Sequence, residues 1–214
     1  MEERSVHRVG ILVIAVWASA WNAGAQEKAT YAVDPAKSRI EIHVDKEGFF
    51  SVFGHDHLIT AKEFSGEARL DPQKIDESWV TLAVAAKSLT VVDPGESEKD
   101  RAEVQKTMLG DTVLDADKYR EMRFTSTRVV NAKKTNGGWE LTLVGKLALH
   151  GAEKPVTFPL RARLDGDALR VEGQVSLRQT EYGITPIKAG GGAVRVKDTL
   201  RIAFDIVGGK KSSE

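Results

Sequence analysis

The sequence predicts an all-β protein of antiparallel strands with one short helix. Apolar and polar residues alternate with period two through most of the chain, as is typical of half-buried strands. In 39–45, for example, Ile40, Ile42 and Val44 occupy one face, and charged or polar residues occupy the other. Turn-forming residues separate many of these runs, and only one segment is rich in helix formers.

The alternating runs are about as many as a small barrel or a sandwich requires. They lie at 39–45, 64–70, 79–84, 124–130, 139–149, 157–164, 168–177 and 200–206. The clearest turns between them are Asp71-Pro72, Asn136-Gly137-Gly138, His150-Gly151 and Asp165-Gly166-Asp167. About eight strands with one apolar face each can close into a barrel or stack as two sheets, and the alternation fits both architectures.

The helical segment is predicted at 97–109. It contains neither Gly nor Pro, it follows Asp93-Pro94-Gly95, and Gly110 stands after it as a C-cap. Ser97 and Asp100 are spaced as in a capping box, with Asp in place of the usual Glu or Gln.

The N-terminus has the pattern of a secretory signal peptide. Arg4 and Arg8 precede a short apolar run at 9–17, and Ala23-Gly24-Ala25 is a cleavage site of the A-x-A kind. We therefore expect a signal peptide at 1–25, one domain at 26–208, a polar tail at 209–214 and a periplasmic location. The alternative is an uncleaved anchor, although the apolar run is shorter than the roughly 20 residues of a membrane span.

The composition argues against several classes of function. Lys+Arg 31 balance Asp+Glu 31, so no basic excess marks a nucleic-acid partner. The absence of Cys rules out disulfides and thiol catalysis. No P-loop, dinucleotide fingerprint or G-x-S-x-G elbow is present, so we expect a binding protein with no catalytic residues and not an enzyme.

The stretch FFSVFGHDHL at 49–58 is the most distinctive in the chain. On a strand, His55 and His57 would point to one face and Asp56 to the other, so this is no His-Asp dyad. A metal site is a weak alternative, because a further ligand such as His43 or His150 would have to come from elsewhere. The third interpretation is the mouth of an apolar pocket, with two imidazoles for a headgroup. Its aromatic part would be Phe49, Phe50 and Phe53.

Several segments, taken together, resemble one family. They read YAVDPAKSRIEIHV, FSGEARLD, DRAEVQKTMLGDTVLDADKYREMRFTST, LTLVGKLALHGAEKPVTFPL and LRQTEYGITPIKAGGGAVRVKDTLRIAFDI. In this order, over 31–207, they resemble the YceI-like, polyisoprenoid-binding domain family, in a variant that carries Gly-His-Asp-His. The helix lacks a histidine that many members have, and Tyr119-Arg120 stands where Tyr-Pro is common.

The resemblance implies an eight-stranded, lipocalin-like antiparallel barrel around an apolar cavity, and it favours the barrel over the sandwich. It also implies a periplasmic, often dimeric protein that holds an isoprenoid or similar amphiphile, with no other cofactor. The expected partners are a hydrophobic small molecule, a membrane that donates or accepts it, and a second copy of the chain. The residues expected at the pocket or its mouth are Ile40, Ile42, Phe49, Phe50, Phe53, His55, His57, Phe64, Phe124, Leu141, Leu143, Tyr182 and Ile184.

Three alternatives remain at this point. The protein is a metal- or haem-linked redox accessory that uses His55 and His57, or an enzyme acting on an isoprenoid or quinone, or a stress or structural protein without a ligand.

Overall fold

The computed structural model describes residues 28–47, 56–189 and 194–212. Eight antiparallel strands form a closed barrel, as predicted. In order around the ring they are β1 (Ala29–Val33), β4 (Phe64–Leu70), β5 (Trp79–Ala85), β7 (Glu121–Thr135), β8 (Gly138–Leu149), β9 (Ala152–Asp165), β10 (Ala168–Arg178) and β12 (Val194–Lys210).

The ring closes between the first and last strands of the described chain. Tyr31 pairs with Lys210, and Val33 pairs with Gly208. The other edge of β1 pairs with β4, where Ala29 lies opposite Leu70. Because the ring is closed, each barrel strand pairs with a neighbour on both sides. Two residues of the expected polar tail, Gly209 and Lys210, therefore belong to the sheet.

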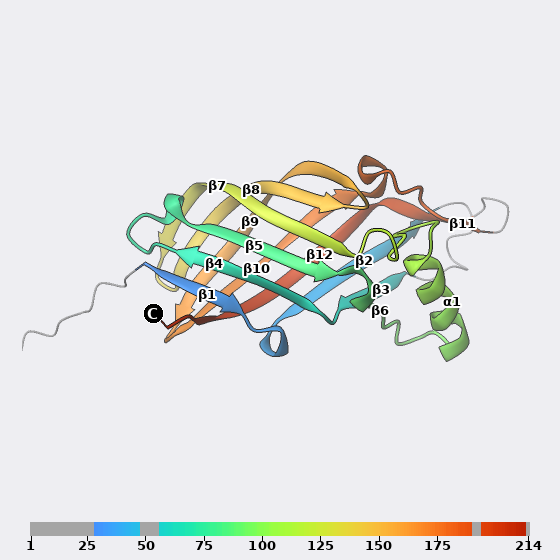
Figure 1. The fold of residues 1–214 in the computed structure, drawn as a ribbon, viewed down its shortest axis with the longest axis horizontal. Helices are drawn as coiled ribbons and strands as arrows, with labels where there is room; N and C mark the ends of the chain where they lie inside the picture. The colour runs from blue at the N-terminus through green and yellow to red at the C-terminus, as the bar shows by residue number, and fades with distance from the viewer. Residues whose placement is uncertain (1–27, 48–55, 190–193, 213–214) are drawn as a thin grey trace, which may run out of the picture.

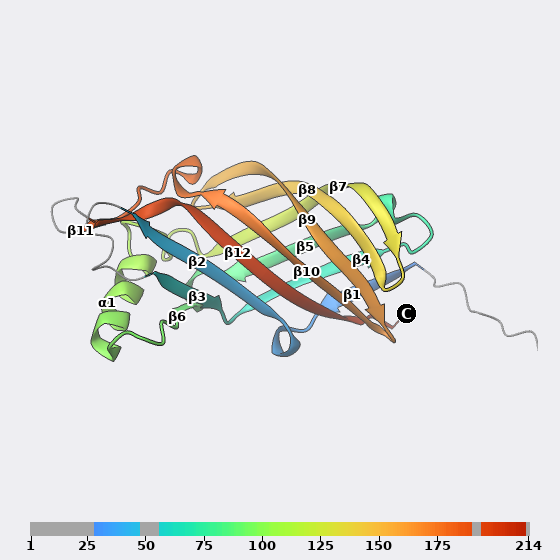
Figure 2. The same cartoon turned by 180° about the vertical axis from the view of Figure 1, so that it is seen from behind.

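A three-strand branch leaves the barrel at β12. It consists of β2 (Arg39–Glu47), β3 (His57–Ala61) and β6 (Leu89–Val91), in that order, and the short β11 (Lys188–Ala189) also pairs with β12. Figure 2 shows β2 lying along β12 on this side of the molecule. The run at 39–45 was expected among the barrel strands, but it belongs to this branch, and the short β1 completes the ring.

One α-helix, α1 (Glu98–Leu109), lies at the end of the barrel opposite the described start of β1 and the C-terminus (Figure 1). The predicted helix and both of its caps are confirmed. Ser97 Oγ accepts from the Asp100 amide at 3.1 Å and donates to the Asp100 carboxylate at 2.6 Å. The Gly110 amide donates to the carbonyls of Lys106 and Thr107 and closes the last turn. Short 3-10 turns at Pro35–Lys37, Ile75–Glu77, Ala86–Ser88 and Gln179–Tyr182 complete the elements.

The turn between β8 and β9 makes contacts with two loops. His150 and Gly151 both have positive φ, 50° and 76°, as a two-residue primed turn requires. The His150 ring lies 4.6 Å from that of Tyr119, and its Nδ1 lies 3.1 Å from the Tyr182 carbonyl. A side chain at Gly151 would strike the Tyr119 ring. His150 thus holds two loops together.

Among the described residues, no helix has the length and apolar character to cross a membrane.

Candidate functional site

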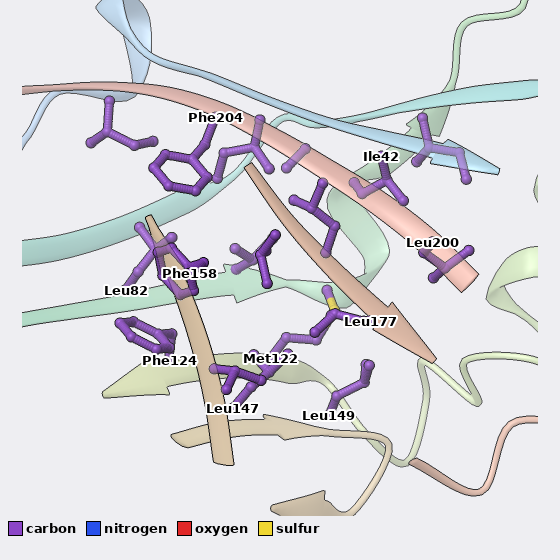
Figure 3. A pocket seen from close by; sticks show the side chains of 18 of the residues that line it. Ile42, Leu82, Met122, Phe124, Leu147, Leu149, Phe158, Leu177, Leu200 and Phe204 are labelled. Carbon is purple, nitrogen blue, oxygen red and sulfur yellow. The ribbon is translucent and has the colours of Figure 1, made fainter. Parts of the chain in front are cut away.

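The apolar faces of the strands enclose a cavity of about 650 Å³ inside the barrel. Its lining is overwhelmingly aliphatic and aromatic. It draws on seven of the eight barrel strands, all but β1, and also on β2, β3, β6 and α1. Figure 3 shows Ile42, Leu82, Leu177 and Leu200 pointing into this space from different strands. A volume of this size lies within the range of pockets that bury small molecules.

Three phenylalanines form a connected row on the wall. Phe158 lies between Phe124 and Phe204, at centroid distances of 5.4 and 5.6 Å, and both pairs are tilted or edge-on (Figure 3). Glycines make room for two of the rings. A Cβ at Gly145 would lie 2.5 Å from the Phe124 ring, and one at Gly173 would lie 2.6 Å from the Phe204 ring.

Most of the residues expected at the pocket lie on the cavity wall. Those that do are Ile40, Ile42, His57, Phe124, Leu141, Leu143 and Ile184. Two others are buried without being part of the lining. Phe64 packs in a core cluster with Ile59 and Met108, and Tyr182, only 1% exposed, packs against Leu149 and Leu177. Phe49, Phe50, Phe53 and His55 lie outside the described residues, as does the expected signal peptide.

The surroundings of Tyr182 are those of a buried core residue. Burial raises the pKa of its hydroxyl, and that hydroxyl has no hydrogen-bond partner in the described part of the chain. Its carbonyl contacts His150. The structure therefore places Tyr182 in the packed wall, and not at an opening.

One polar residue of the cavity wall, His57, pairs with the buried Asp93, which is not itself in the lining. His57 follows the same face of β3 as Ile59 and Ala61, and all three line the cavity. Its Nδ1 lies 2.7 Å from an oxygen of Asp93, which is 3% exposed. The other Asp93 oxygen accepts from the Leu58 amide. One buried carboxylate thus holds both the ring of His57 and the start of β3.

The first turns of α1 are fastened beside this pair. Arg101 Nη1 donates to the carbonyl of Asp93 at 3.3 Å and to that of Glu96 at 2.7 Å. On the helix, Asp100, Glu103 and Thr107 share one face with Val104 and Met108, and all five line the cavity. Asp100, Glu103 and Thr107 are also exposed. We call the two carboxylates, Asp100 and Glu103, the acidic rim.

The cavity reaches the opposite end of the barrel near Ile75–Glu77. There it is lined by Arg69, Ser78 and Trp79, and Arg69 pairs with Trp79 in the register between β4 and β5. Arg69 is the only Lys or Arg in the lining of the described structure, and Trp79 is 37% exposed. The two ends of the cavity therefore differ in charge.

The described residues include no group of three or more His, Cys, Asp or Glu side chains arranged to hold a metal ion. His43, on β2, is not in the cavity lining, and His150 serves the β8–β9 turn. Neither joins His57.

Sequence reasoning missed Phe158, Phe204, Asp93 and the cavity-facing side of α1. The alternation already places Phe204 in phase with Leu200 and Ile202, so that residue could have been found. Asp93 reads locally as part of an Asp-Pro-Gly turn, and nothing near it in the sequence indicates a partner 36 residues away.

Solved structures with the same fold include BcnA of Burkholderia cenocepacia, at 21% identity and a TM-score of 0.64, over 82% of this chain and 98% of that one. Another is a polyisoprenoid binding domain from Saccharophagus degradans implicated in plant cell wall breakdown, at 13% identity and a TM-score of 0.58, over 86% and 100% of the two chains. At these identities the likeness establishes the fold.

Among curated relatives, a UPF0312 protein of Vibrio parahaemolyticus is 34% identical over 137 residues, which are 63% of each chain. A UPF0312 protein of Pseudomonas putida is 31% identical over 135 residues, 59% of this chain and 63% of that one. The match thus spans about 63% of the length of these relatives. The model of the YceI-like domain matches residues 31–208, which is nearly all of the described chain, and the protein is therefore a member of the YceI-like family.

Proposed function

We propose that this protein is an exported, periplasmic binding protein that holds a long-chain isoprenoid or similar amphiphile in the barrel cavity. The observation that carries the proposal is the cavity itself, about 650 Å³ of space inside the barrel with an almost entirely apolar wall. The Saccharophagus degradans domain of the same fold, which is described as polyisoprenoid-binding, supports the choice of ligand.

The binding mechanism is burial of the tail. Apolar surface removed from water contributes about 25 cal/mol per Å², and a long prenyl tail offers several hundred square ångströms of it. Association itself costs roughly 4–15 kcal/mol, so a tail has to be long to bind tightly. No bond is made or broken in this mechanism, in keeping with a role as a carrier and not as an enzyme. A membrane would supply and receive the ligand, and two copies would form the homodimer.

The test is to express the 214-residue chain in a bacterial host and purify it from the periplasmic fraction. We expect protein that begins at Gln26 and carries an extractable isoprenoid or related lipid at near-stoichiometric amounts by mass spectrometry. Elemental analysis of the same sample measures metal.

Two results would overturn the proposal. One is that the protein purified from the periplasm contains no lipid and still binds none after incubation with prenyl lipids. The other is a stoichiometric metal or haem that is lost in His57→Ala but kept in His43→Ala. The latter would favour the redox alternative, for which a carboxylate-bound histidine is a suitable ligand.

A further inference from the structure

We propose that the His57 end of the cavity selects a neutral headgroup that donates a hydrogen bond, such as the hydroxyl of a prenyl alcohol, and disfavours an anionic headgroup. The inference rests on the proposed binding function and specifies the chemistry of the head. It follows from three features: the hydrogen bond between Asp93 and His57, the position of the His57 ring on the cavity wall, and the charged residues near that ring.

Asp93 determines which nitrogen of His57 carries the proton. As a carboxylate, Asp93 can only accept hydrogen bonds. One of its oxygens accepts from the Leu58 amide, and the other lies 2.7 Å from His57 Nδ1. The Nδ1 atom must therefore carry the proton in the neutral ring. The Nε2 atom then carries a lone pair and can accept a hydrogen bond from a ligand.

The ring is positioned so that Nε2 is the atom offered to a ligand. His57 lies on the cavity face of β3, and its neighbour in the register, Val44 of β2, also lines the cavity. The ring nitrogen on the Asp93 side is occupied, so the opposite side of the ring is left for the cavity. The histidine side chain is about 21% exposed, which leaves room for a contact.

The charges near this end disfavour an anion. Asp100 and Glu103 of the acidic rim lie on the cavity face of α1, whose first turns are tied to Asp93 through Arg101. A carboxylate or phosphate head would face these groups, and like charges repel. The only Lys or Arg among the described lining residues is Arg69, at the other end of the barrel.

The experiment compares three ligands with one C20 prenyl tail: the alcohol, its methyl ether and the carboxylic acid. The ether can accept a hydrogen bond but cannot donate one, so the alcohol-to-ether ratio of affinities isolates donation to Nε2. For the wild-type protein at pH 8 we expect the alcohol to bind about three to ten times more tightly than the ether, which is the range for one neutral hydrogen bond. The acid should bind more weakly than the alcohol.

Asp93→Asn provides the decisive variant. The Asn oxygen can still accept from Leu58, while its amide donates to Nδ1 and so moves the ring proton to Nε2. The ring then donates to either oxygen, and the alcohol-to-ether ratio should fall to about one. His57→Ala should give the same loss, whereas His43→Ala, on the neighbouring strand but outside the lining, should keep the wild-type ratio. Each ratio is taken within one variant, so a general loss of stability does not mimic the effect.

Glu103→Gln tests the rim without touching the core, because Glu103 is exposed. It should raise the affinity for the acid relative to the affinity for the alcohol about twofold at low salt. Equal binding of alcohol and ether by the wild type, or tight binding of the acid that Arg69→Gln abolishes, would overturn this inference and leave the proposed function intact. Failure of all three ligands to bind would overturn both.

Discussion

Asp198 is a residue whose contacts tie the stability of the fold to pH. Its two carboxylate oxygens accept from the backbone amide and the hydroxyl of Thr180, both at 2.8 Å, and from Arg178 at 3.1 Å. The hydrogen bond that the Thr180 backbone amide donates contributes most to lowering the pKa of Asp198 below its ordinary value of 3.8. The carboxylate thereby fastens the turn Gln179–Tyr182 to β12.

A carboxyl group whose pKa is lower in the folded state stabilises the fold above its unfolded pKa. That stabilisation is lost as the pH falls through the folded value. We therefore expect Asp198→Asn to have a lower urea midpoint at pH 7 and a flatter stability curve below about pH 4. The measurement is urea unfolding between pH 2 and 7, with Glu181→Gln in the same turn as the control. Parallel curves for Asp198→Asn and the wild type would show that this carboxylate carries none of the pH dependence.

At the scale of elements, α1 substitutes for a missing strand. In the described sheet β6 pairs with β3 on one side only. On the other side, the Gln105 side chain accepts from the Val91 amide at 2.8 Å and donates to the Leu89 carbonyl at 2.7 Å. A neighbouring strand would likewise accept from the Val91 amide and donate to the Leu89 carbonyl. The helix thus covers an edge that would otherwise be open to pairing with another chain.

Gln105→Ala should remove both bonds and lower the free energy of unfolding by about 1–3 kcal/mol. The local effect should be larger than the global one. We expect faster hydrogen exchange at the Val91 amide, with little change at the centre of β8. Lys106→Ala, on the exposed side of the same helix, is the control. If hydrogen exchange at the Val91 amide is the same in Gln105→Ala and the wild type, the Gln105 side chain does not stabilise the β6 edge.

At the scale of the whole molecule, the barrel is closed and incompletely filled, and the proposed binding depends on both features. Val175 and Gln174 are neighbours on β10, but Val175 lines the cavity and Gln174 is exposed. A large side chain at the first position fills the interior, and the same side chain at the second only adds to the surface.

We expect Val175→Trp to reduce the amount of co-purified lipid at least tenfold, because the indole occupies space that a tail needs. Gln174→Trp should keep the wild-type amount. The readout is the ratio of lipid to protein by mass spectrometry, together with the urea midpoint to show that both variants fold. Undiminished lipid in Val175→Trp would place the tail outside the cavity.

The sequence alone determined which residues turn inward along strands such as β2 and β8. Burial of one face imposes period two, so Ile40, Ile42, Leu141 and Leu143 were predicted on the wall and lie there. The helix and its caps were equally readable, because Ser97 and Gly110 act within one turn. All of these features depend on residues close together in the chain.

Only the tertiary structure decided which strands close the ring and which side chains meet across it. Tyr31 pairs with Lys210, and His57 meets Asp93, through contacts between distant parts of the chain that leave no local pattern. Phe64 illustrates the limit. It has the inward phase of β4, yet it packs against Ile59 and Met108 and is not part of the lining. Alternation assigns a face, whereas the packing of the neighbouring elements decides whether that face meets a cavity or a filled core.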